Sequence, residues 1–180
     1  MSRQYGFSLL ELLCVLAILS ILAHAGSAQF LSVSQKTKDK NTLKNEMKRL
    51  ADALTQARQL AVISGQTSFL CGGVNCDGGW SSGFILYQVE SNSGAEKHYR
   101  QIVFDPSLAV SWRGFPTQKN QIEFRSNGLS GYQNGTFEFC LGAWQADLIL
   151  NQSGRFYLTD PQGVDPKGSY SQGTNGGQCG

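Results

Sequence analysis

One carboxylate stands in an otherwise apolar segment near the start of the chain. Glu11 is the only charged residue between Phe7 and Ala23, and most of its neighbours there are Leu, Ile, Val or Ala. A carboxylate in an apolar environment is costly unless it is paired, and such residues usually have a function. Glu11 is therefore the first candidate functional residue.

The length of this segment fits a membrane-spanning helix. A helix needs roughly 20 apolar residues to cross a bilayer, with a range of about 17–25. Arg3, with no acidic residue beside it, favours a cytoplasmic N-terminus. The alternative is a secretory signal peptide with a cleavage site at residues 23–25 or 27–29, but a signal peptide has no reason to carry Glu11.

The residues Gly6-Phe7-Ser8-Leu9-Leu10-Glu11 resemble the processing site of type IV prepilins and of type II secretion pseudopilins. The resemblance implies that prepilin peptidase cuts between Gly6 and Phe7 and that Phe7 is then N-methylated. It also implies that the apolar helix is kept as a membrane anchor and filament core, where Glu11 pairs with the N-terminal amine of a neighbouring subunit. Glycine suits the cleaved bond because a residue without Cβ lets a protease approach the backbone.

An amphipathic segment follows the anchor. Its apolar residues recur at steps of three and four, and they are Leu43, Met47, Leu50, Leu54, Ala57 and Ala61. This period predicts a helix that continues the anchor from about Phe7 to Ser64, with Gly65 as its stop. The apolar face is expected to pack on a sheet.

The same segment is basic, and its basic residues are Lys36, Lys38, Lys40, Lys44, Lys48 and Arg49. Two interpretations stay open. The residues form a solvated helical face, which we favour, or they contact the phosphates of lipid headgroups or nucleic acid.

The rest of the chain has short alternating runs between turn residues, which predict an antiparallel sheet with one modest core. The expected strands are residues 67–71, 83–89, 101–104, 121–124, 136–141, 147–151 and 154–158. Asn127-Gly128, Asn134-Gly135 and Ser153-Gly154 are expected to form turns or hairpins.

Four of the five cysteines lie in this domain. Four cysteines in a translocated protein suggest a disulfide framework with three alternative pairings. We expect Cys71–Cys76, and Cys140–Cys179 tying the C-terminal tail to a strand. Cys14 is expected to be a small apolar residue of the anchor. A zinc site is disfavoured, because the spacing does not fit a zinc ribbon.

The domain resembles the GspH/FimT group of minor pilins and pseudopilins, and the matching stretches occur in the group's order. They are residues 49–63, 68–71, 76–84, 124–128, 137–140 and 154–155. DNA-binding members of the FimT group carry Gly-Arg-x-Arg where this chain has Gly154-Arg155-Phe156-Tyr157, so the second arginine is missing. The candidate DNA-binding residues are Arg155, Tyr157, Arg125, Arg113 and Lys167. A net charge of +2 gives no strong nucleic-acid footprint.

No nucleophile elbow, phosphate loop or dinucleotide-binding motif is present, and neither His24 nor His98 stands in a catalytic pattern. We therefore expect no enzyme, no cofactor and no metal.

The expected fold is α+β and pilin-like. It has a leader peptide at 1–6, a transmembrane and filament-core helix at 7–34, an amphipathic continuation at 35–64 and a β-rich domain at 65–180. The resemblance implies a minor pilin of a type IV pilus in the inner membrane and the filament, with a cytoplasmic N-terminus and a periplasmic domain. The implied partners are prepilin peptidase and other major and minor pilins. A pseudopilin of type II secretion and a minor pilin that binds double-stranded DNA during natural transformation are the alternatives.

Overall fold

A computed structural model describes residues 8–90, 93–116 and 119–164, and within them the side chains of residues 23–31 are left aside. The chain divides into two compact units, one up to Lys38 and one from Asp39 on. The long helix α1, Leu9–Ser64, contributes to both. Each unit is described by itself.

The first unit consists of the N-terminal half of α1. Its apolar side chains from Leu9 to Leu22 are exposed on all sides of the helix. Among the described residues, no helix combines the length and the hydropathy that a membrane crossing needs. The predicted span at residues 7–34 stays a prediction.

The C-terminal half of α1 supplies one wall of the core. All six apolar residues that the sequence places on one face are at most 1% exposed. The helix ends at Ser64, and Gly65 follows with a φ of 68°. Only glycine adopts this left-handed conformation readily, which is why it ends helices. The predicted helix face and the predicted stop are confirmed.

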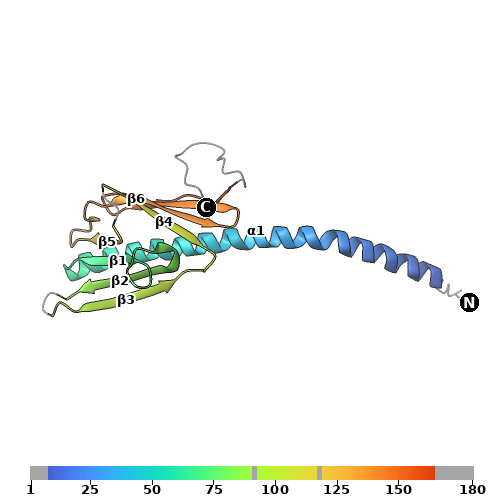
Figure 1. The fold of residues 1–180 in the computed structure, drawn as a ribbon, viewed down its shortest axis with the longest axis horizontal. Coiled ribbons are helices and arrows are strands. Elements are labelled where there is room, and N and C mark those ends of the chain that lie inside the picture. Colours follow the sequence, from blue (N-terminus) through green and yellow to red (C-terminus); the bar gives the residue numbers. More distant parts are fainter. Residues whose placement is uncertain (1–7, 91–92, 117–118, 165–180) are drawn as a thin grey trace, which may run out of the picture. The chain divides into compact units, whose positions relative to one another are not determined.

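The second unit contains two antiparallel sheets. The first has the order β3-β2-β1-β5, and its strands are β1 (Ser68–Gly72), β2 (Gly83–Val89), β3 (Glu96–Val103) and β5 (Gln121–Phe124). The second has the order β4-β6-β7-β8, with strands β4 (Ala109–Phe115), β6 (Asn134–Leu141), β7 (Trp144–Leu150) and β8 (Phe156–Leu158). A short strand β9, Gln162–Gly163, pairs with β7, and a 3₁₀ helix η1, Trp80–Ser82, precedes β2. Figure 1 shows the strands gathered along the second half of α1.

Both sheets and α1 share one hydrophobic core. Its largest fully buried side chains include Phe84 and Phe124 from the first sheet and Phe137 and Phe139 from the second. A smaller cluster of Cys71, Ile85 and Tyr87, with Phe69 packed on it, lies apart from this core. The α+β pilin-like architecture agrees with the sequence analysis.

Several details of the sheets differ from the prediction, among them the start of β7 at Trp144, three residues early, and the additional strand β9. Strand β4 was not predicted, although its residues alternate between exposed and buried, with Val110 and Trp112 facing the core. Strand β3 begins at Glu96, five residues before the predicted start. The sequence pattern missed this part of the strand, because its side chains are exposed and do not alternate between apolar and polar. A predicted turn also differs.

The pair Asn134-Gly135 lies inside β6 and is not a turn. Gly135 is instead required by close packing. A Cβ on this residue would lie 2.2 Å from the Arg113 carbonyl oxygen and 2.7 Å from the Trp112 ring. The glycine that suggested a turn therefore marks the close approach of two strands.

Candidate functional site

Glu11 lies in the first turn of α1 and is exposed. A negative charge is favourable there, because the helix dipole is positive at its N-terminus. Within the described residues the carboxylate has no hydrogen-bond or ion-pair partner. Gly6 and Phe7, the predicted cleavage site, lie outside the described residues.

The apolar side chains around Glu11 are exposed as well. Leu9, Leu10 and Ile21 are 77%, 71% and 68% exposed. An isolated helix that is apolar on every side is covered by lipid or by other helices, since water would solvate it poorly. The first unit is thus built for contacts with other molecules.

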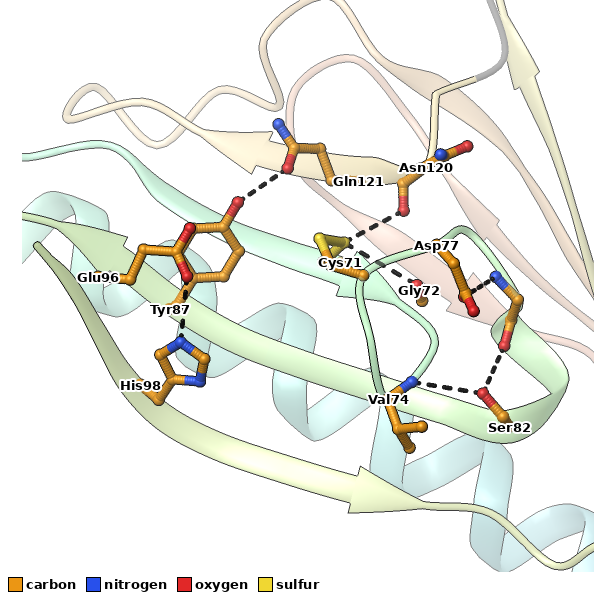
Figure 2. Close-up of a disulfide and its surroundings, with 12 residues drawn as sticks. Cys71, Gly72, Val74, Asp77, Ser82, Tyr87, Glu96, His98, Asn120 and Gln121 are labelled. Carbon is orange, nitrogen blue, oxygen red and sulfur yellow. Dashed lines mark hydrogen bonds and ion pairs between the residues drawn. A yellow bond between two sulfur atoms is a disulfide. The ribbon is translucent and has the colours of Figure 1, made fainter.

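The first disulfide joins Cys71 of β1 to Cys76 in the loop that follows, as predicted. Figure 2 shows it between Asn120 and Gly72, with the Cys71 sulfur 3.8 Å from the Asn120 carbonyl oxygen. The loop is further held by the Gly79 N–H, which donates to Asp77 Oδ1 over 2.8 Å. Disulfide and loop bonds together fix the chain that leads into η1.

This loop delivers Trp80 to the core. The indole is 3% exposed and meets the Phe137 ring edge-on at 4.7 Å. Gly72 makes room for it, because a Cβ there would lie 2.4 Å from the Trp80 ring. The disulfide therefore has a structural role at the junction of the two sheets.

The second predicted disulfide involves Cys179, which lies outside the described residues. Cys140 is disulfide-bonded, and its pairing with Cys179 stays a prediction. Cys14 is free and exposed on the first half of α1. Its role as a small apolar residue of the anchor stays a prediction.

Two of the candidate DNA-binding arginines are paired with carboxylates. Arg113 lies 3.5 Å from Glu138, and Arg125 lies 3.5 Å from Glu123. The Arg125 guanidinium also lies over the Tyr132 ring, 5.4 Å from its centroid. A nearby carboxylate thus partly compensates the charge of each arginine, and the Arg125 contact is made through Nε alone.

The other candidates are dispersed. Arg113, Thr136, Ile149 and Tyr157 form one cross-strand row from β4 to β8. Three strand spacings of about 4.8 Å put Arg113 and Tyr157 roughly 14 Å apart. Arg155 is exposed, and Lys167 lies outside the described residues. The described candidates do not form one patch, because Arg113 and Tyr157 lie apart, although Arg125 and Arg155 flank neighbouring turns.

The basic stretch of α1 is partly engaged by the domain. The Lys40 ammonium lies 4.7 Å from the centroid of the Trp144 ring, and Lys44 pairs with Asp160 over 3.5 Å. Arg49 donates to Glu46 over 2.6 Å. These contacts favour the interpretation of a structural, solvated face over a phosphate-binding one.

The sequence analysis did not identify a pair of carboxylates on the second sheet. Glu138 of β6 and Asp147 of β7 are direct cross-strand partners. Glu138 accepts a 2.6 Å hydrogen bond from Gln145 Nε2, whereas Asp147 Oδ1 is buried without a partner among the described residues. The alternation of side chains along β6 and along β7 could have shown which face of its strand each acid occupies. The register that places Glu138 opposite Asp147 is set only by the tertiary structure.

Burial raises the pKa of both carboxyls. Arg113 opposes the shift at each, and the charge of Asp147 adds to it at Glu138. The pair thus holds protons more tightly than carboxyls in the unfolded chain.

A second feature not predicted is a pocket at the turn after β5. It has a volume of about 100 Å³ and is lined by Arg125, Asn127, Leu129, Gly131, Tyr132 and Gln152. Only folding brings Gln152 beside the turn at 125–132. Among the described residues no group of three or more potential ligands could hold a metal ion.

The family described as "Type II transport protein GspH" matches residues 46–154, more than half of the chain. The chain belongs to the GspH family. The "Prokaryotic N-terminal methylation motif" matches residues 1–27, which include Gly6, Phe7 and Glu11. GspH and this motif make the chain a minor pilin or pseudopilin of the type IV pilus and type II secretion class.

Two solved structures show the same fold. The type IV minor pilin FimU of Pseudomonas aeruginosa is 21% identical and covers 64% of this chain and 91% of its own, with a TM-score of 0.52. The minor pseudopilin EpsH of the Vibrio cholerae type II secretion system is 14% identical and covers 70% and 99%, also with a TM-score of 0.52. No protein with a curated description matches significantly.

Proposed function

We propose that this GspH-family chain is a minor pilin that contributes to the assembly and initiation of a type IV pilus. Prepilin peptidase cleaves it between Gly6 and Phe7, and Phe7 is then N-methylated. It is held in the inner membrane by the segment at 7–34, with a periplasmic domain, until it enters the filament. Its partners are prepilin peptidase and other major and minor pilins.

The exposed apolar half of α1 is the observation that carries this proposal. Its side chains are exposed, and a membrane and then a bundle of pilin helices can cover them. The carboxylate of Glu11, which has no partner among the described residues, fits the same sequence of events. The amine released on Phe7 of a neighbouring subunit can neutralise it in the apolar filament core.

The test is to replace Glu11 in piliated cells and measure the chain in sheared pili. We expect Glu11→Ala and Glu11→Gln to lower its incorporation at least tenfold, because an unpaired amine would remain in the filament core. Asp52→Asn removes a charge from the exposed face of α1 and serves as the matched control. Full incorporation of the Glu11→Ala variant would contradict the assembly role.

Processing is tested separately with Gly6→Ala. A Cβ at this position should block leader removal, which is visible as a heavier chain on a gel. Normal processing of this variant would show that the bond is elsewhere.

A pseudopilin of type II secretion is the alternative, since it uses the same helix and processing site. Deletion of the chain separates the two. Loss of piliation with normal secretion supports the pilus, and the opposite result supports the secretion system.

Capture of DNA by the domain is the second alternative. The ion pairs of Arg113 and Arg125 weigh against it, because phosphate binding needs several available cations. Binding of a labelled duplex that weakens with salt and with Arg155→Ala would support it.

A further inference from the structure

The pocket after β5 has the features of a recognition site. Its apolar part consists of Leu129 and Tyr132, which are 44% and 66% exposed. Exposed tyrosines and arginines that border a pocket are the residue types that most often dominate protein interfaces. The guanidinium of Arg125 over the Tyr132 ring combines the two in one place.

The polar part of the pocket offers hydrogen-bond donors. Asn127 Oδ1 accepts a bond from the Leu129 N–H, and its amide NH₂ has no partner among the described residues. The side chain of Gln152 makes no hydrogen bond there either. Arg125 makes its 3.5 Å contact with Glu123 through Nε, which leaves its terminal nitrogens for a ligand. This donor set fits a carboxylate.

The surroundings add positive charge. Arg58 of α1 lies against the turn, since a Cβ on Gly128 would be 3.1 Å from its Nε. A Cβ on Gly154 would in turn be 2.7 Å from the Gly128 carbonyl oxygen, which places exposed Arg155 next to the same turn. Within the described residues neither Arg58 nor Arg155 forms an ion pair. The carboxylate of Glu123 lies beside Arg125 and Gly131, but the three arginines outnumber it, so an acidic partner is favoured over a basic one.

The turn is held in shape before any partner binds. The buried hydroxyl of Ser130 donates to the Gln133 carbonyl oxygen over 2.6 Å and lies 3.1 Å from the Asn151 carbonyl oxygen. Gln133 Nε2 donates to the Gln121 carbonyl oxygen over 3.1 Å. Gly131, with a φ of 48°, closes the turn against Glu123. A preformed site loses less conformational entropy on binding.

We propose that this pocket docks an acidic segment of another filament subunit. A carboxylate of the partner binds Arg125 and the amides of Asn127 and Gln152, and an adjacent apolar residue packs on Leu129 and Tyr132. The proposal rests on the proposed function, because the occupant is a subunit of the same filament.

The test places the photo-crosslinker p-benzoylphenylalanine at position 132 of the full chain in piliated cells. Position 157 carries it in the control, because Tyr157 is a similarly exposed tyrosine (60%) that does not line the pocket. We expect position 132 to cross-link to another filament subunit, at a peptide with Asp or Glu beside an apolar residue. Position 157 should give no such product.

A charge test accompanies it. Gln152→Glu puts a carboxylate of the same shape into the lining, and we expect it to lower the cross-link yield at position 132 at least fivefold. Lys48→Glu changes charge by two units on the exposed face of α1 and should change the yield less than twofold.

The outcomes are separable because incorporation into sheared pili is measured in the same cells. A chain that is incorporated but gives no subunit cross-link at position 132, or one insensitive to Gln152→Glu, overturns the docking site alone. Cross-links to nucleic acid instead of a subunit also overturn it. A chain that never enters the filament overturns the proposed function and the docking site together.

Discussion

Asp147 places a charged oxygen where no donor reaches it within the described structure, next to the carboxylate of Glu138. Both pKa values are raised in the folded domain, mainly by burial. Groups with raised pKa values add stability below the unfolded value, and that stability is lost as the pH rises through the folded value. These two carboxyls should therefore make the domain more stable in mild acid than at neutral pH.

We predict that Asp147→Asn stabilises the domain at pH 7 and has little effect near pH 4. The gain at pH 7 is about 1 kcal/mol or less, because Asp147 is only partly buried and solvent screens its charge. Chemical denaturation at both pH values measures it. Asp52→Asn, on the exposed face of α1, is the control and should show no such pH dependence. A destabilised Asp147→Asn domain at pH 7 would mean that this carboxylate has an attractive partner.

The disulfide Cys71–Cys76 constrains the loop that leads to Trp80. We predict that Cys71→Ser with Cys76→Ser lowers the free energy of unfolding by about 2 kcal/mol through lost loop constraint, with some added cost for the buried Cys71 site. Thermal unfolding of the double variant against the wild type measures this loss. An unchanged melting temperature would show that the loop hydrogen bonds alone hold Trp80 in place.

At the scale of elements, α1 has two halves with opposite surroundings. Residues from Leu43 to Ala61 have one buried face, whereas the described side chains from Leu9 to Leu22 are exposed. The period of the sequence predicted the amphipathic C-terminal half, because an amphipathic helix repeats every 3.6 residues whatever it packs on.

We predict that Leu54→Ala destabilises the domain by about 2–5 kcal/mol, since it leaves a cavity between α1 and the sheets. The comparison is Ile63→Ala on the same helix, where the side chain is 84% exposed and the expected loss is below about 0.5 kcal/mol. Denaturant unfolding compares the two. Equal losses would mean that α1 packs differently from the structure.

At the scale of the whole molecule, the buried core lies entirely in the second unit among the described residues. Its first member is Leu43 and its last is Leu150. We predict that a fragment from Gln35 onward folds cooperatively, with the same hydrogen-exchange protection in β2, β6 and β7 as the full chain. Loss of cooperative unfolding would show that the first half of α1 stabilises the domain.

The sequence by itself determined the elements whose signals are local. The motif around Glu11, the helix face from Leu43 to Ala61, the Gly65 stop and the disulfide Cys71–Cys76 follow from neighbouring residues, and so does the GspH resemblance. Steric and periodic constraints act over a few residues, so they can be recognised in the sequence before the fold is known.

The tertiary structure alone decided which distant residues meet. It paired Glu138 with Asp147, placed Arg113 beside Glu138, separated Arg113 from Tyr157 and brought Gln152 to the turn at 125–132. Each of these depends on strand register and on the packing of two sheets against one helix. A shift of one residue would turn every side chain to the other face, and no local pattern sets that choice across segments far apart in sequence.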